Sequence, residues 1–147
     1  MTVKSFRGLM GDGDIETISL HTNDGSTGYK IIKLQLFAAN PGLVNQEMVV
    51  KVFSIPQTTA TSATDFSDNT LLAVSYYKAN EAPNNNFMTT TIFDNAKFNQ
   101  DIHLTCKDAS TGESVNYYIE LEQVKLSLDE NTVATLKDIR NIEAQNV

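Results

Sequence analysis

The sequence contains one cysteine, Cys106, and no tryptophan among its 147 residues. A single cysteine excludes an intramolecular disulfide and fits a reducing compartment or assembly inside a cell. A chain of this length can bury roughly 70% of its unfolded surface, so we expect one domain, residues 1–147, that folds without covalent cross-links. The absence of tryptophan removes the flat aromatic platform on which many sugar-binding surfaces depend.

Clustered positive charge and long apolar runs are also missing. The 11 Lys and Arg residues are spread along the chain and outnumbered by 18 Asp and Glu residues, which gives a net charge of −7. This excess of negative charge repels phosphates, so neither nucleic acid nor an anionic membrane surface is expected as a partner. No apolar run approaches the ~20 residues of a membrane-spanning helix, and the start, MTVKSFRGLM, lacks the apolar core of a signal peptide.

Histidine is almost as scarce as cysteine, with His21 and His103 only. These two residues and Cys106 lack the short spacings that zinc sites use, so we assign no metal ligands, no cofactor and no catalytic residues. His103 alternates with Ile102 and Leu104, which predicts an exposed position on a strand. Cys106 shares the phase of these two apolar residues, which predicts a buried thiol.

One acidic segment, GDGDIE at residues 11–16, has the alternating carboxylates that can bind calcium. The EF-hand pattern then requires a glycine at the sixth position and a glutamate at the twelfth. Thr17 and Asn23 occupy those positions, so the pattern fails. The segment also lacks the Gly-Lys-Ser/Thr end of a phosphate-binding loop. We interpret it as a turn.

What the sequence does contain is alternation of apolar and polar side chains with a period of two residues, which is typical of strands that are buried on one face. About eight segments show it or have the composition of a strand: KSFRGLM, DIETISL, GYKIIKLQLF, EMVVKVF, LLAVSYY, FMTTTIF, DIHLTC and the segment from Val115. Turn residues such as Asn23-Asp24-Gly25 separate them. The pattern predicts an all-β protein: an antiparallel β-sandwich, jelly-roll-like, with one C-terminal helix.

The alternation also predicts which side chains share a face. The apolar faces comprise Ile32, Leu34 and Leu36; Met48, Val50 and Val52; Leu72, Val74 and Tyr76; and Ile102, Leu104 and Cys106. Lys33, Gln35 and Lys51 are among the residues expected on opposite faces.

The last strand candidate changes phase. Apolar residues occupy odd positions from Val115 to Leu121, and then even positions at Val124, Leu126 and Leu128. We predict a β-bulge near Glu122–Gln123, where the strand passes to the other sheet at a corner of the sandwich. The alternative is that the strand ends near Glu122 and a new element begins.

Two further segments could contact partners. The connection Pro56–Thr70 is long and polar, and Phe66 is its one large apolar residue. We expect this loop to be mobile in the free subunit and to become ordered on a partner through Phe66.

The C-terminal segment predicts a helix over about residues 129–143, with a capping box of Ser127 and Glu130. Its narrow apolar stripe comprises Val133, Leu136, Ile139 and Ile142. The stripe either covers the chain's own sandwich or packs on a neighbouring subunit.

Three stretches carry a resemblance: YYIELEQVKLSLDENTVATLKDIRN, MTVKSFRG and GYKIIKLQL. With them the chain resembles, from end to end, the small accessory virion proteins of tailed bacteriophages, especially marine phages. The resemblance implies a structural protein that is assembled in the bacterial host cytoplasm and located in the virion.

Within that family, capsid decoration (cement) proteins are β-rich, oligomeric and bound across capsomers outside the shell. The expected partners are therefore the major capsid protein or other virion proteins, and further copies of the chain. Phe66, Val133, Leu136, Ile139 and Ile142 are the expected interface residues. A tail, collar or head–tail junction component is the alternative, and a carbohydrate-binding module or hydrolase ranks third.

Overall fold

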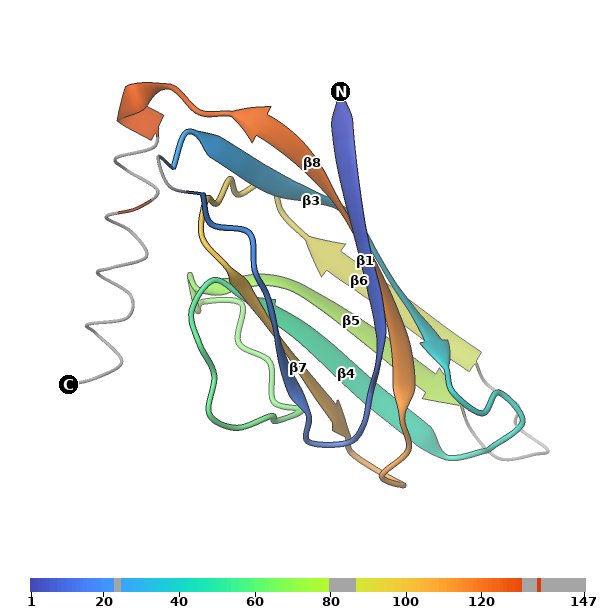
Figure 1. The fold of residues 1–147 in the computed structure, drawn as a ribbon. Helices are drawn as coiled ribbons and strands as arrows, with labels where there is room; N and C mark the ends of the chain where they lie inside the picture. The colour runs from blue at the N-terminus through green and yellow to red at the C-terminus, as the bar shows by residue number, and fades with distance from the viewer. Residues whose placement is uncertain (23–24, 80–86, 131–134, 136–147) are drawn as a thin grey trace.

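The chain forms an antiparallel β-sandwich, which confirms the predicted fold class (Figure 1). The computed structural model describes residues 1–22, 25–79, 87–130 and 135. Eight strands contain 55% of the described residues: β1 (Thr2–Met10), β2 (Ile15–Ile18), β3 (Thr27–Ala38), β4 (Gln46–Phe53), β5 (Leu71–Ala79), β6 (Phe87–Phe93), β7 (Ile102–Asp108) and β8 (Val115–Lys125).

The strands form two sheets, ordered β1-β8-β3 and β2-β7-β4-β5-β6. Apart from β6, this is the order of an eight-stranded jelly roll, in which the sixth strand completes the first sheet beside the third. Here β6 instead pairs with β5 through its whole length, so β3 and β6 are the outer strands of different sheets. Because β6 is absent from the first sheet, the sandwich is open on the side between β3 and β6.

The core lies between the two sheets, and in most strands the residues that it contains are those that the alternation predicts. The predicted faces of β4 and β7, together with the odd positions of β8, are buried; the members are Met48, Val50, Val52, Ile102, Leu104, Cys106, Val115, Tyr117, Ile119 and Leu121. Each large aliphatic side chain buried in this way contributes about 1.5–3 kcal/mol. Cys106 is fully buried as predicted.

A β-bulge does occur, but in β3 and not in the last strand. Ile31 pairs with Leu121 and Lys33 pairs with Glu120, so Ile32 is the extra residue. The bulge puts Ile31 in the core with Leu34, and the prediction that Ile32 shares the inner face is wrong. Periodicity alone could not locate the bulge because both Ile31 and Ile32 are apolar.

The predicted bulge near Glu122–Gln123 is wrong. β8 pairs with β1 without a register shift as far as Gln123 and stays in the three-stranded sheet until it ends at Lys125. The change of phase arises beyond the strand, where the Leu126 amide donates to the Ser26 carbonyl oxygen at 2.8 Å. Leu126 packs over Gly28, where a Cβ atom would lie only 2.8 Å from the leucine side chain.

The outer face of the five-stranded sheet is buried in part, around Lys51 on β4, where residues of the 54–70 segment contact it. Lys51 is only 5% exposed, and its Nζ donates to Thr61 Oγ1 at 3.1 Å and to the Ala63 carbonyl oxygen at 2.7 Å. Burial of its side chain lowers the pKa of Lys51, although the nearby Asp68 acts in the opposite direction. The loop therefore forms a third layer over this sheet.

This third layer overturns two predictions. Val74 and Tyr76 lie on the loop-facing side of β5, whereas the inner face carries Ala73 and Tyr77, which pair with Val52 and Met48. His103 was expected to be exposed but is buried. In β5 the register on β4 shifts at Leu72, so Leu72 lies in the core while Val74 faces outward. A sheet region with two covered faces also accepts apolar residues in either phase.

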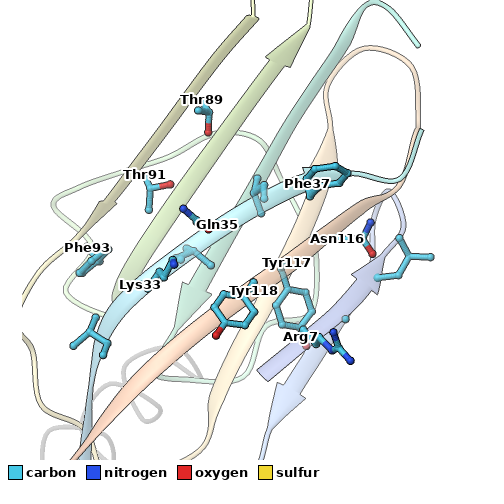
Figure 2. A pocket seen from close by; sticks show the side chains of 15 residues that line it. Arg7, Lys33, Gln35, Phe37, Thr89, Thr91, Phe93, Asn116, Tyr117 and Tyr118 are labelled. Atoms are coloured by element: carbon cyan, nitrogen blue, oxygen red, sulfur yellow. The ribbon is translucent and has the colours of Figure 1, made fainter. Parts of the chain in front are cut away.

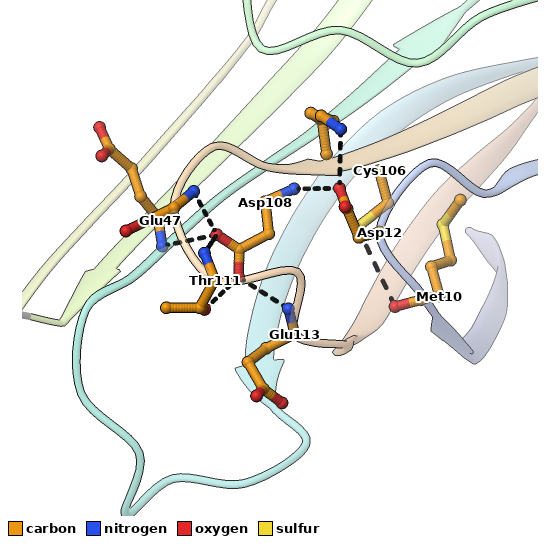
Figure 3. A network of polar contacts seen from close by, with 9 residues as sticks. Met10, Asp12, Glu47, Cys106, Asp108, Thr111 and Glu113 are labelled. Atoms are coloured by element: carbon orange, nitrogen blue, oxygen red, sulfur yellow. Dashed lines mark hydrogen bonds and ion pairs between the residues drawn. The ribbon is translucent and has the colours of Figure 1, made fainter.

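A buried carboxylate fixes the turn between β7 and β8 (Figure 3). Asp108 Oδ1 accepts hydrogen bonds from the amides of Ser110 (2.9 Å), Thr111 (3.1 Å) and Glu47 (3.3 Å). Its Oδ2 accepts from Thr111 Oγ1 at 2.9 Å and from the Glu113 amide at 3.0 Å. Burial alone would raise the pKa of Asp108, but these hydrogen bonds hold it below its ordinary value. Asp108 thus ties the turn that joins the two sheets to β4.

The capping box at the start of the C-terminal helix is confirmed. The Glu130 amide donates to Ser127 Oγ at 3.2 Å, and the Ser127 amide donates to Glu130 Oε1 at 3.3 Å. Residues 128–130 are helical, and Lys97 forms an ion pair of 2.8 Å with Glu130. The apolar stripe of Val133, Leu136, Ile139 and Ile142 lies outside the described residues.

Candidate functional site

A groove of about 1000 Å³ runs over β3 on the open side of the sandwich (Figure 2). Strand β6 supplies one wall, and β8 and β1 supply the other. The lining residues are Arg7, Gly8, Leu9, Ile32, Lys33, Leu34, Gln35, Leu36, Phe37, Thr89, Thr91, Phe93, Asn116, Tyr117 and Tyr118.

The bulge in β3 determines which of its side chains enter the groove. Beyond Ile32, Leu34 lies in the core, so Lys33, Gln35 and Phe37 lie on the opposite, outer face of the strand. Figure 2 shows these three residues between the side chains of β6 and those of β8 and β1. Phe37 is 65% exposed, which is a large exposure for an aromatic residue in a strand.

The β6 wall is built from side chains that face the space between the sheets. Thr91 pairs with Ser75 and Phe93 pairs with Ala73, whose side chains lie on the inner face of β5. Ser75 Oγ lies 2.8 Å from Thr91 Oγ1, which ties the two strands together on this face. β3 and β6 belong to different sheets and are not hydrogen-bonded to each other. The inner face of β6 therefore remains accessible along the edge that faces β3.

The opposite wall carries cations and an aromatic ring. Lys33 Nζ lies 5.7 Å from the ring centroid of Tyr118, within the range of a cation–π interaction. Tyr118 Oη donates to Glu120 Oε1 at 2.7 Å, and this hydrogen bond is the main cause that raises the pKa of Tyr118. Arg7 lies across the strand pair from Tyr118. The wall therefore combines positive charge with an oriented phenol.

The chemistry that these side chains offer is contact and hydrogen bonding. Aromatic and aliphatic surface comes from Leu9, Phe37 and Phe93, and amide groups come from Gln35 and Asn116. Pockets that bind partners or small ligands combine such apolar surface with a few polar groups. Among the described residues, no three His, Cys, Asp or Glu side chains are grouped in a way that could hold a metal ion.

In the acidic turn between β1 and β2, the carboxylates of Asp12 and Asp14 bind groups of the protein itself. Asp14 Oδ2 accepts from the Gly11 amide at 2.7 Å, and Asp12 Oδ1 accepts from the Asp108 amide at 2.9 Å. Asp12 also forms an ion pair of 3.3 Å with Lys107. The interpretation of this segment as a turn is therefore confirmed.

The titratable groups singled out in the sequence lie apart from the groove. Burial and the surrounding acidic residues raise the pKa of Cys106 to about 12, so its thiol is poorly suited to act as a nucleophile. His21 is bound at the surface to Asp101, with 2.7 Å between Nδ1 and Oδ1. His103 Nδ1 lies 3.0 Å from Thr17 Oγ1, and burial lowers the pKa of His103.

Of the five predicted interface residues, Phe66 is described and is 66% exposed on the covering loop. It borders a smaller hollow beside Ile92 and Phe93, on the side of β6 away from the groove. Sequence reasoning missed Leu9 and Phe37. The signal for Phe37 was present, because it continues the polar phase of Lys33 and Gln35.

Comparisons with known proteins add no family. No protein-family model matches the chain, and no curated protein matches it significantly. Within the ranges that the structure describes, no helix is long and apolar enough to span a membrane.

Proposed function

We propose that this chain is a structural virion protein of the capsid decoration type, which binds across capsomers of a bacteriophage shell. The single observation that carries the proposal is the exposed apolar surface at the open side of the sandwich. Leu9 is 56% and Phe37 is 65% exposed, and Phe93 lies on the β6 wall of the same groove. Leu9 and Phe37 lie on either side of Asn116. Exposed apolar side chains that are gathered in one groove are typical of a protein–protein contact site.

The framework around this surface suits a binding role. Leu9 and Phe37 lie on β1 and β3, which are hydrogen-bonded to opposite edges of the central strand β8. Binding residues on a rigid sheet lose little conformational freedom when a partner is bound, which favours affinity. Arg7 and Lys33 beside them give this face local positive charge in a chain of net charge −7.

The fold permits this role without requiring it. Jelly-roll sandwiches occur in viral capsid proteins and also in lectins and cupins, so architecture alone does not decide function. The resemblance to accessory virion proteins favours the structural role over the others. The groove provides the surface through which such a role would act.

The test is the location of the chain in purified virions, together with its copy number by quantitative mass spectrometry. A decoration protein is expected at hundreds of copies and on the outside of the shell. A copy number of about six or twelve would replace the proposal with the tail or neck alternative. Absence from the particle would overturn the virion role.

A matched pair of variants tests the surface itself. Phe37→Ser should weaken rebinding to particles that lack the protein by about tenfold or more, because large aromatic side chains carry much of the energy of an interface. Val44→Ser, at an exposed apolar residue in the loop between β3 and β4, is the control and should bind as the wild type does. Equal binding by both variants would exclude this groove as the contact.

A further inference from the structure

The sandwich has four edge strands, and three of them are protected against pairing with another chain. Exposed edges are protected in natural proteins by charged residues, bulges, shortness or coverage. β1 carries Lys4 and Arg7, and β2 is only four residues long. β3 carries two lysines and the bulge at Ile32, and Phe98 pairs with Tyr29 on its outer side through hydrogen bonds of 2.8 and 2.9 Å.

Among the described residues, the fourth edge, β6, has none of these protections. Its seven residues include no charged residue and no proline, and its pairing with β5 has no register shift. Within the described part of the chain, its backbone pairs with β5 alone. Met88 and Ile92 are about half exposed, at 50% and 48%. In Figure 1, β6 is the outermost strand of its sheet.

The sequence of β6 is symmetric in chemical type. It reads Phe-Met-Thr-Thr-Thr-Ile-Phe, with Thr90 at its centre. In an antiparallel pair of two identical strands centred on Thr90, Thr89 lies opposite Thr91 and Met88 lies opposite Ile92. Threonine thus meets threonine and an apolar side chain meets an apolar side chain, and such cross-strand pairs stabilise sheets. A two-fold interface requires this kind of self-complementarity.

Charge points to the same partner. Two copies of a chain with a net charge of −7 repel each other, so they associate best where neither brings acidic side chains to the contact. β6 is the edge strand that carries no charge of either sign. A second copy can pair there without placing like charges opposite each other.

The groove supplies area that strand pairing alone lacks. One pair of short strands covers a narrow strip, whereas stable interfaces bury roughly 800 Å² on each partner. The inner-face residues Thr89, Thr91 and Phe93 line the groove of about 1000 Å³. A second β6 beside the first would present its own inner-face side chains along the open end of that groove.

We propose that β6 pairs with the β6 of a second copy of this chain, antiparallel and about a two-fold axis at Thr90, so that the two five-stranded sheets become continuous. The inference rests on the edge strand and does not depend on the virion role. It accounts for an uncharged, unprotected edge in an otherwise protected sandwich.

The test is a charge exchange across the two-fold axis, read by sedimentation of the full chain over a range of concentrations. Met88→Lys with Ile92→Glu places lysine opposite glutamate twice in the proposed pair. Met88→Lys with Ile92→Lys places lysine opposite lysine twice. Residues 88 and 92 of one strand are too far apart to pair with each other, since a strand rises about 3.3 Å per residue.

The wild type and the Lys/Glu variant should be dimers, and the Lys/Lys variant should dissociate with a Kd raised by about tenfold or more. Added salt should weaken the Lys/Glu dimer more than the wild-type dimer. Matching circular dichroism and melting curves would show that all three chains are folded. A monomeric wild type at every concentration, or the same oligomeric state for both variants, would overturn the proposal.

Discussion

Lys51 and Lys33 occupy comparable positions, each on the outer face of its own sheet, but their surroundings differ. Lys51 is nearly inaccessible beneath residues 54–70, where its ammonium group is hydrogen-bonded to Thr61 and Ala63. Lys33 lines an open groove, where its ammonium group lies over the Tyr118 ring. The five-stranded sheet is thus covered on both faces around β4, whereas the outer face of the three-stranded sheet remains available around Lys33.

The difference shows that alternation identifies the two faces of a strand but not what covers them. A polar residue in the outward phase is solvated on one sheet and buried on the other, depending on a loop that is distant in sequence. The same loop restricts where a partner can bind, because it occupies the outer face of the five-stranded sheet around Lys51. The groove and the β6 edge are the surfaces that this arrangement leaves open.

The largest expected effect comes from removing the link between the two sheets. Asp108→Ala leaves five donors without their acceptor, four of them backbone amides, and should lower the free energy of unfolding by about 3 kcal/mol or more. Urea unfolding would measure the loss. Asp108→Asn retains one carboxamide oxygen and should lie between the wild type and the alanine variant. A loss below about 1 kcal/mol would contradict the role of this carboxylate.

A smaller loss of stability is expected at Lys51 than at Asp108, and comparison with Lys33 distinguishes the covered outer face from the open one. Lys51→Ala removes two hydrogen bonds that hold the covering loop and should cost about 1–3 kcal/mol, whereas Lys33→Ala should change stability by less than about 0.5 kcal/mol. Limited proteolysis should cut the Lys51→Ala variant within residues 54–70 faster than the wild type. Equal stability of the two variants would mean that the loop contributes nothing to the five-stranded sheet.

The smallest effect is a dependence on pH at the covered face. Burial lowers the pKa of His103 below its ordinary value of 6.5, although nearby Asp101 acts in the opposite direction. The unfolded chain therefore binds a proton at a pH where the folded chain does not, so stability should fall as the pH drops below about 6.5. The loss should continue until the pH passes the lowered pKa of the folded state.

His103→Gln should reduce this acid-side slope, because the group that takes up the proton on unfolding is then missing. The wild-type chain is the reference for this slope. Chemical unfolding at a series of pH values between about 4.5 and 7.5 gives both slopes. An unchanged slope in His103→Gln would show that His103 is protonated equally in the folded and unfolded chains.

Much of the fold follows from local pattern. The inner positions of β4 and β7 alternate strictly, and Ser127 with Glu130 forms the expected capping box. The errors have long-range causes. The bulge at Ile32 depends on pairing with β8, and the burial of His103 depends on tertiary coverage of the outer face.

The candidate site was harder to predict for the same reason. Phe37 and Phe93 are 56 positions apart in sequence and line one groove only because β6 pairs with β5. The apolar content of FMTTTIF was visible, but its place at an edge was not. Edge position is a property of the strand order, which no single segment specifies.

The order of the strands also implies that the two sheets can form at different times during synthesis of the chain. β8 is the last of the described strands and the central strand of its sheet, so β1 and β3 have no neighbour in that sheet until residues 115–125 have been synthesised. All members of the five-stranded sheet precede β8 and can associate earlier. During translation, the inner-face side chains of Met48, Val50 and Val52 therefore lack the core residues of β8 until that strand has been synthesised. Such exposure of a partly built core slows folding and makes the nascent chain a natural client for chaperones.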